Sequence, residues 1–268
     1  MWNKVEDISE CKSKRGKLIL FGVEVEMEFK RGSRAIYEEF EGFDKKEDGS
    51  LRGGIEYVFN KPYNYKKSLE LIKNLYEKLK EHDYVISERT STHIHMDVRD
   101  FNPYQLASLL TMYYFYEASF VNIASEERRN NKFCITGLVS PLSIKNAFDL
   151  FSDDYSITEA LAYGRRRRYC AMNVLEAVKN FGSIEFRFFE GNLDYNKFEK
   201  WLKMLYTLGS TAKKYTTRKH LFFLFNCLFI HNKRFFKKVF PFLEYKEDIN
   251  VEVLSILDNT IRRGYLWN

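Results

Sequence analysis

The sequence predicts an α+β fold, in which strands dominate the first two thirds of the chain and helices the last third. Several short segments between residues 18 and 195 alternate apolar and polar residues, as strands with one buried face do. From Asn196 onward the chain is rich in Phe, Leu and Lys, which indicates three or four helices. No repeat, linker or change in composition divides it. We therefore expect one domain over residues 1–268, with a sheet core at about 18–195 and a helical region at about 196–268.

Three segments in the first half are predicted to be strands: Leu18–Phe29, Gly54–Phe59 and Thr92–Val98. In each of them one parity is mostly apolar and the other is charged or polar, so one face of the sheet should be buried and the other lined by charge. Between the second and third strands, Asn64–His82 carries an apolar stripe at helical spacing and is predicted to be a helix. The polar parity of the three strands holds Glu24, Glu26, Glu28, Glu56, His93, His95 and Asp97.

The elements that follow are predicted from local signals. Asn102-Pro103-Tyr104-Gln105 offers an Asn cap, a Pro at the first helical position and a Gln three residues after the cap. A helix should therefore begin there and run to about Ser125. A further short helix is expected over Ile157–Tyr163, and two more strands over Tyr169–Val174 and Ser183–Phe189.

The composition is that of a folded protein with a large core. Hydrophobic residues make up 45% of the chain and aromatic residues 17%, which excludes a disordered or fibrous chain. The net charge of +6 permits an anionic ligand but falls short of a dedicated nucleic-acid binder. The four cysteines form no CxxC pair, which favours a reducing compartment. Residues 1–17 lack the apolar stretch of a signal peptide and Tyr104–Ala124 is too polar for a membrane span, so we expect a cytoplasmic protein without a membrane partner.

A row of glutamates on one strand face is the most informative feature. Glu24, Glu26 and Glu28 would lie about 6.7 Å apart, where they repel one another and gain nothing from packing. A solvated outer face is the simplest interpretation of such a row. However, Glu56, the histidine row and Glu185 are also polar positions on otherwise apolar strands, so these groups converge if the strands share a sheet. Oxygen ligands with few imidazoles suit Mg²⁺ or Mn²⁺ better than zinc.

Two arginine features point to an anion. Arg187 lies two residues from Glu185 on the same strand face, where its guanidinium could hold a phosphate or carboxylate by two hydrogen bonds. The run Arg165-Arg166-Arg167-Arg168 is most simply a solvated basic loop, although one of its arginines could supply a second anion contact. The sequence contains no P-loop, dinucleotide-binding or nucleophile-elbow motif.

Five short motifs occur in the order seen in the amidoligases of the carboxylate–amine ligase superfamily. They are Phe21-Gly22-Val23-Glu24-Val25-Glu26, Asp48-Gly49-Ser50-Leu51 followed by Gly54-Ile55-Glu56, Thr92-His93-Ile94-His95, Arg168-Tyr169 with Asn173, and Ser183-Ile184-Glu185-Phe186-Arg187. Over about residues 18–195 the chain thus resembles this family, whose superfamily includes glutamine synthetase and glutamate–cysteine ligase. One departure is Ser91-Thr92 before the histidines, where glycine is more usual.

The resemblance implies a fold and a set of ligand contacts. The fold would be a glutamine-synthetase-like antiparallel sheet with helices packed on one face, and with ATP and Mg²⁺ (or Mn²⁺) bound on the concave face. By motif position, Glu185 and Arg187 would be the catalytic pair. Asp48, Arg168, Asn173 and Arg187 would contact the nucleotide or substrate, and the metal ligands would be Glu24, Glu26, Glu56, His93, His95 and Glu185.

The function that the resemblance implies is an ATP-dependent carboxylate–amine ligase, which forms an amide or peptide bond through an acyl phosphate. Its partners would be a small-molecule or peptide carboxylate and an amine, without nucleic acid. The residues alone leave two alternatives open. A metal-dependent phosphodiesterase or nuclease would use the same acids, histidines and basic run. A catalytically degenerate binding or scaffold protein would keep the fold without the chemistry.

Overall fold

The computed structural model describes residues 18–30, 38–137, 169–247, 254, 255 and 257–259. An eight-stranded sheet runs through this part of the chain in the order β2-β3-β1-β6-β8-β7, and β4 and β5 pair with the two ends of β1. The described strand pairs are antiparallel. The strands are β1 (Leu20–Phe29), β2 (Phe43–Lys46), β3 (Gly54–Phe59), β4 (Tyr63–Asn64), β5 (Tyr84–Val85), β6 (Ser91–Asp97), β7 (Met172–Asn173) and β8 (Ser183–Glu190).

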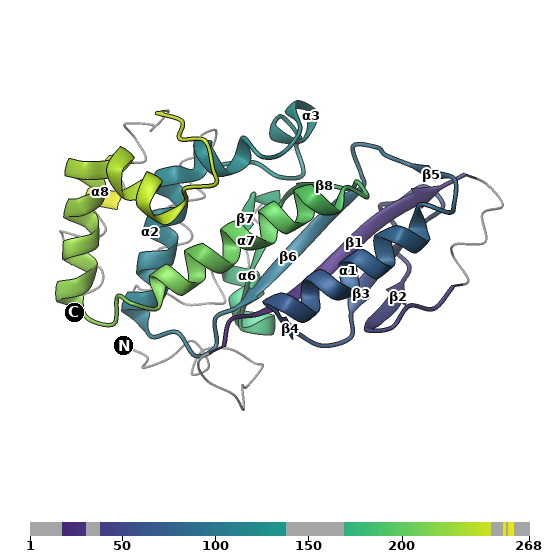
Figure 1. The fold of residues 1–268 in the computed structure, drawn as a ribbon, viewed down its shortest axis with the longest axis horizontal. Helices are drawn as coiled ribbons and strands as arrows, with labels where there is room; N and C mark the ends of the chain where they lie inside the picture. The colour runs from purple at the N-terminus through teal and green to yellow at the C-terminus, as the bar shows by residue number, and fades with distance from the viewer. Residues whose placement is uncertain (1–17, 31–37, 138–168, 248–253, 256, 260–268) are drawn as a thin grey trace.

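Helices cover one face of this sheet. The long ones are α1 (Tyr65–Leu79), α2 (Pro103–Val121), α7 (Tyr195–Ala212) and α8 (Arg218–Val239). Helices α1 and α7 lie side by side in front of the central strands, and α2 and α8 pack together next to them (Figure 1). The predicted class, an α+β fold with an antiparallel sheet and helices on one face, is confirmed.

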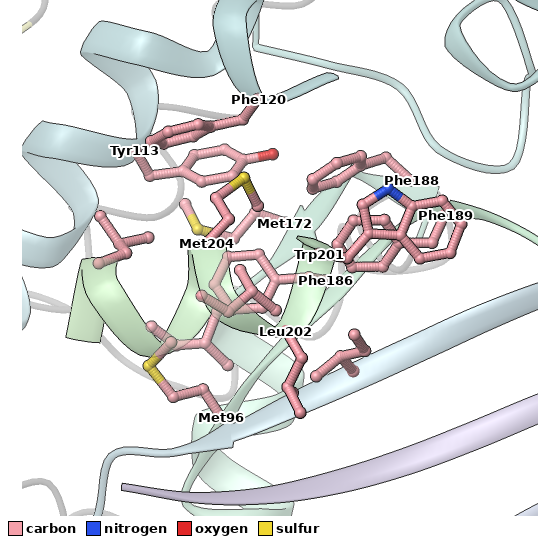
Figure 2. Close-up of a cluster of buried hydrophobic side chains, with 14 of the residues drawn as sticks. Met96, Tyr113, Phe120, Met172, Phe186, Phe188, Phe189, Trp201, Leu202 and Met204 are labelled. Carbon is pink, nitrogen blue, oxygen red and sulfur yellow. The ribbon is translucent and has the colours of Figure 1, made fainter. Parts of the chain in front are cut away.

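The apolar parity of the strands forms the core beneath these helices. Val23, Val25 and Met27 of β1 are fully buried. Figure 2 shows a cluster of aromatic and sulfur-containing side chains between β8 and the helices. Within it, Trp201 of α7 stacks on Phe189 of β8 with ring centroids 4.3 Å apart. The opposite parity of the same strands is therefore left for the other face, as the alternation predicts.

Both helix starts that the sequence predicts in the first half are confirmed. Asn64 caps α1 by accepting a hydrogen bond from the Lys67 amide. Asn102 and Gln105 form a reciprocal capping box at the start of α2. Helix α2 ends at Val121 rather than near Ser125, because Ser125 serves as the cap of a separate short helix, α3 (Glu126–Arg129).

Other predicted elements differ from the structure. The strand expected over Tyr169–Val174 is reduced to β7, and a helix that was not predicted, α6 (Leu175–Phe181), follows it. Gly182 ends α6 in the left-handed conformation, with a φ of 66°, and β8 begins at the next residue. The helix expected over Ile157–Tyr163 lies outside the described residues. None of the described helices combines the length and apolarity that crossing a bilayer requires.

Candidate active site

Five neighbouring strands, β3, β1, β6, β8 and β7, bring their polar side chains together on the sheet face opposite the long helices. Antiparallel registers place residues from distant parts of the chain directly across from one another. The pairs are Glu24 with His93, Glu26 with Glu56, His95 with Glu185, and Asn173 with Glu185. These strands share one sheet, so their acidic and imidazole side chains converge on one face, as the sequence predicts for that case.

The centre of this face is a group of two carboxylates and two imidazoles. Ligand atoms of Glu24, His95 and Glu185 all lie within 4.8 Å of one another. Glu24 Oε2 lies 3.2 Å from His93 Nδ1, and Glu24 Oε1 lies 3.3 Å from His95 Nε2. His93 Nδ1 is also 3.5 Å from Glu185 Oε1. Two carboxylates thus face two ring nitrogens across a small space.

The electrostatics of this group favour ionised carboxylates. Burial opposes ionisation of Glu24, but the neighbouring histidines outweigh it and hold the pKa of Glu24 well below its usual range. Burial likewise opposes ionisation of Glu185, yet His95 and Arg187 lower the pKa of Glu185. Burial also disfavours the charged form of His95, but Glu24 raises the pKa of His95 above its usual value. The site is thus built to surround positive charge with carboxylates.

A serine orients each histidine. Ser91 Oγ donates to the Glu26 carboxylate and lies 2.7 Å from His93 Nε2. Because the one hydroxyl proton goes to Glu26, Ser91 Oγ can accept a hydrogen bond from His93 Nε2. In the neutral ring with its proton on Nε2, the Nδ1 lone pair is available to bind a cation beside Glu24. Ser183 Oγ lies 3.1 Å from His95 Nδ1. His95 Nε2 is buried and has no hydrogen-bond partner among the described residues.

Glu185 is held from two sides. Arg187 Nη1 donates to Glu185 Oε1, and Asn173 Nδ2 donates to Glu185 Oε2 over 2.8 Å. Asn173, which by its motif position would contact nucleotide or substrate, therefore fixes the Glu185 carboxylate in this structure. Arg168, the other expected contact of that motif, lies outside the described residues together with the rest of the arginine run.

Two cavities open on either side of the central group, and Glu24 lines both. The first, of about 270 Å³, we name the arginine cavity. It is lined by four acids, three arginines, three smaller polar side chains and two aromatic rings: Glu24, Glu26, Asp48, Glu56, Arg89, Arg128, Arg187, Ser50, Ser91, His93, Phe133 and Tyr169. Asp48 accepts a hydrogen bond of 2.7 Å from the Ser50 amide, which orients its carboxylate at this wall.

The second cavity, of about 340 Å³, we name the phenylalanine cavity. Its walls are more apolar, with Val58, Phe59 and Phe181 among the lining side chains. Lys46 and Lys61 add positive charge there. Glu24 lines both cavities, so the carboxylate and imidazole group lies between them.

The donor set fits a divalent cation. Glu24 and Glu185 bring ionised oxygens, and His95 brings a buried ring nitrogen that has no other described partner. Glu26 and Glu56, opposite each other in register, extend the oxygen set into the arginine cavity. Acids crowded in this way repel one another unless a cation lies between them.

Burial and the repulsion between these acids both raise the pKa of Glu56. Burial, together with the charges of Glu24 and Glu26, raises the pKa of Glu56 to about 8. In the unfolded chain this carboxyl has its ordinary pKa of 4.5. Between pH 4.5 and about pH 8, the folded state therefore keeps a proton on Glu56 that the unfolded state has lost. Stability of the metal-free protein should therefore fall as pH rises from about 4.5 to about 8.

Glu56→Gln tests this expectation. In EDTA, the melting temperature of the wild type should drop more between pH 5 and pH 8.5 than that of the variant, because the variant has no proton to lose at this position. Adding Mg²⁺ at pH 8.5 should restore much of the wild-type loss. Equal slopes with pH for the two proteins would show that Glu56 is not the group that titrates.

Some lining residues were not predicted. Ser91 shares the parity of His93 and His95, so the strand pattern contained the signal for it. Arg89 precedes β6, and Arg128 comes from α3, a four-residue helix whose Glu-Glu-Arg-Arg sequence is typical of a solvated surface. No periodicity in the sequence places either arginine beside the glutamates.

No curated protein sequence matches the chain. A structurally similar solved chain is a bifunctional glutathione synthetase from Pasteurella multocida, with 9% sequence identity and a TM-score of 0.42. The match covers 92% of this chain but 47% of that one, so this chain spans about half of its length.

A family model described as "putative amidoligase enzyme" matches residues 43–208. This range is more than half of the chain and contains Glu56, His93, Glu185 and Arg187, while Glu24 precedes it. The resemblance seen in the sequence motifs is thereby confirmed, and the chain belongs to this amidoligase family.

Proposed function

We propose that the protein is an ATP-dependent carboxylate–amine ligase, which forms an amide or peptide bond through an acyl phosphate. The observation that carries the proposal is the group of Glu24, His93, His95 and Glu185 between two cavities, with Arg187 beside it. In such a reaction the nucleotide and the acceptor carboxylate meet at one phosphoryl group. Each of them needs a cavity beside the group of residues that binds the negative charge. The amidoligase family match supports the same class.

The metal ligands in this proposal are those of the central group and its neighbours. Glu24, His93, His95 and Glu185 would hold Mg²⁺ or Mn²⁺ at the centre, and Glu26 and Glu56 would extend the site into the arginine cavity. A bound divalent cation offsets the repulsion between a triphosphate and an acceptor carboxylate. Asn173 and Ser91 contribute indirectly, by holding Glu185 and His93 in place.

The nucleotide is assigned to the phenylalanine cavity. Apolar walls suit a nucleoside base, and Lys46 and Lys61 suit its phosphates. The arginine cavity would instead expose four carboxylates to the triphosphate. With the nucleoside on one side, the γ-phosphoryl group would lie over the central group, and the acceptor carboxylate would approach it from the arginine cavity, which also holds Asp48.

The reaction then proceeds in two displacements. An oxygen of the acceptor carboxylate attacks the γ-phosphorus, the bond from that phosphorus to the β-phosphate oxygen breaks, and ADP leaves. Arg187 stabilises charge on the transferred phosphoryl group. The amine nitrogen then attacks the acyl carbon, the carbon–oxygen bond to phosphate breaks, and the nitrogen gives up a proton to a base. Walls on both sides limit access of water to the acyl phosphate.

Hydroxylamine provides a test that needs no knowledge of the natural amine. Purified protein would be incubated with Mg²⁺, ATP, hydroxylamine and a panel of amino acids, short peptides and dicarboxylic acids. An acyl phosphate would be trapped as a hydroxamate, with one ADP formed per hydroxamate. With an ¹⁸O-labelled carboxylate, one ¹⁸O atom should appear in the released phosphate, because the attacking oxygen stays with phosphorus.

Two results would contradict the proposal. Cleavage of DNA or of bis(p-nitrophenyl) phosphate that depends on Mg²⁺ but not on ATP would favour a phosphodiesterase. Absence of Mg²⁺–ATP binding by calorimetry would favour a binding protein without this chemistry. Either result would leave the described geometry intact and remove the assigned reaction.

Ser91→Ala tests how His93 is oriented. Without the hydroxyl, the His93 proton is no longer confined to Nε2, so the ring should populate both tautomers. We expect Mn²⁺ affinity to fall roughly 10- to 100-fold, as it does when a metal-ligating histidine loses its orienting partner. ¹⁵N NMR of the ring in the metal-free protein reports the tautomer directly. An unchanged tautomer with unchanged Mn²⁺ affinity would show that Ser91 has no orienting role.

A further inference from the structure

One buried arginine of the arginine cavity has no ion-pair partner among the described residues. Arg128 is only 4% exposed and lines the cavity wall. Its Nη2 donates to the backbone oxygen of Arg187 over 2.6 Å, while its Nε is buried and has no hydrogen-bond partner among the described residues. No carboxylate in the described part of the chain lies within ion-pair distance of it. A buried cation without a partner is costly for the fold.

Two other arginines on this sheet face do form ion pairs with acidic residues. Arg187 pairs with Glu185, and Arg99 pairs with Asp97 at 2.6 Å. Burial lowers the pKa of Arg128, and the more distant charges of Glu26 and Glu190 offset this only in part. The part of the chain that the structure describes thus keeps a desolvated guanidinium at a cavity without pairing it with an anion, and a ligand is the natural source of that anion.

Further donors face the same space. Arg89 and Arg187 also line the arginine cavity, and each has a buried Nε without a partner among the described residues. Arg89 Nη1 donates to the backbone oxygen of Ser50 over 2.6 Å, which fixes the side chain at the wall. Three guanidinium groups exceed what a single reacting carboxylate requires.

We propose that Arg128, assisted by Arg89, binds a second anionic group of the acceptor substrate, which makes that substrate a small diacid. The inference rests on the proposed function for the fate of the first carboxylate, which lies beside Arg187 and is phosphorylated. The second anionic group is not phosphorylated, and its contacts with Arg128 and Arg89 hold the substrate in the cavity. A cavity of about 270 Å³ suits a small acid or the end of a peptide rather than a folded protein.

The phosphates of ATP are the competing source of this anion. The lining charges argue against them, because the arginine cavity sets four acidic side chains against three arginines. The phenylalanine cavity offers Lys46, Lys61 and Arg99 against Glu24 and Asp97. A diacid brings two negative charges rather than about four, so it is repelled less by the same acids.

Matched probes test the inference. Succinate and glutarate would be compared with butyrate and valerate, which have the same chain lengths but one carboxylate, by calorimetry on the full chain with Mg²⁺ and a non-hydrolysable ATP analogue. The wild type should bind the diacids roughly 10- to 100-fold more tightly, since a hydrogen-bonded charge pair is worth about that factor. Arg128→Gln should remove the preference and leave affinity for the ATP analogue within about twofold.

The control is Arg129→Gln, at the next residue of the same helix. Arg129 is exposed and donates to Asn122, so its loss should leave the diacid preference unchanged. If Arg128→Gln does not fold, Arg128→Lys keeps the charge but not the planar fork and should weaken the preference. The comparison of diacid with monoacid on the wild type needs no variant.

The outcomes separate the two proposals. Equal affinity of the wild type for diacids and monoacids would overturn the inference. Loss of affinity for the ATP analogue in Arg128→Gln, with the diacid preference kept, would assign the arginine to phosphate and also overturn it. A diacid preference that depends on Arg128, without any hydroxamate formation, would support the anion site while contradicting the ligase.

Discussion

Glu24→Gln is expected to reduce ATP-dependent hydroxamate formation by about 10³-fold, more than any other single substitution in the site. Glu24 is the one described residue that lines both cavities, and its two oxygens face His93 and His95 separately. Glutamine keeps the size and polarity of the side chain, so the fold should be retained. The negative charge is lost, and with it the charge that would hold the proposed cation between the two substrates.

Glu28→Gln is the matched control for this change. Glu28 lies on the same face of β1 and is more deeply buried than Glu24, but it lines neither cavity and accepts a hydrogen bond of 2.7 Å from the Arg52 amide. Glutamine can still accept that bond, so activity and Mn²⁺ affinity should stay near wild type. Both variants would be measured for hydroxamate formation, Mn²⁺ affinity and melting temperature. If Glu24→Gln kept a tenth or more of the wild-type rate, the assigned metal centre would be wrong.

The strand alternation explains why much of the central group could be predicted. In β1 and β6 charged or polar residues alternate strictly with apolar ones, so each kind lies on its own face of the strand. The single assumption that the two strands share a sheet then brings Glu24 next to His93. The capping signals of α1 and α2 likewise depend on a few adjacent residues. In each case the information is local, and the structure adds only the register.

The parts that could not be predicted depend on tertiary contacts. Arg128 reaches the arginine cavity because α2 ends early and α3 returns the chain to the edge of β8, a path that no sequence period records. The strands β2, β4 and β5 have only two to four residues, too few to show an alternation. They are held by pairing with β1 and β3.

A change of register at the end of β8 is a further case. Ile94 pairs with Phe186, but Thr92 pairs with Phe189, so β8 carries one extra residue between these pairs. Phe188 still points into the core like Phe186, so the alternation of β8 reverses after Phe188. Phe189, which by strict alternation would share the face of Glu185, points instead into the core and meets Trp201. The apolar sequence Phe-Phe allows both registers, so the sequence alone does not determine it.

Trp201→Ala is expected to have the largest effect on stability, about 3–5 kcal/mol. Trp201 is fully buried, and its ring stacks on Phe189 with an interplanar angle of 23° (Figure 2). Removing the indole leaves a cavity between α7 and β8 that rigid neighbours cannot fill. Trp201→Phe should cost less than about 1.5 kcal/mol, because the buried Nε1 has no hydrogen-bond partner among the described residues to lose.

Urea unfolding measures both variants, provided that the dependence of the free energy on urea concentration is unchanged. Because the extra residue of β8 directly follows the pairing of Phe186, the stacking of Phe189 on Trp201 anchors the end of the strand that also carries Arg187. Trp201→Ala should therefore weaken binding of succinate more than binding of the ATP analogue, even at temperatures where the variant is fully folded. A uniform loss of both affinities would mean that the substitution acts on stability alone and that β8 keeps Arg187 in place without this contact.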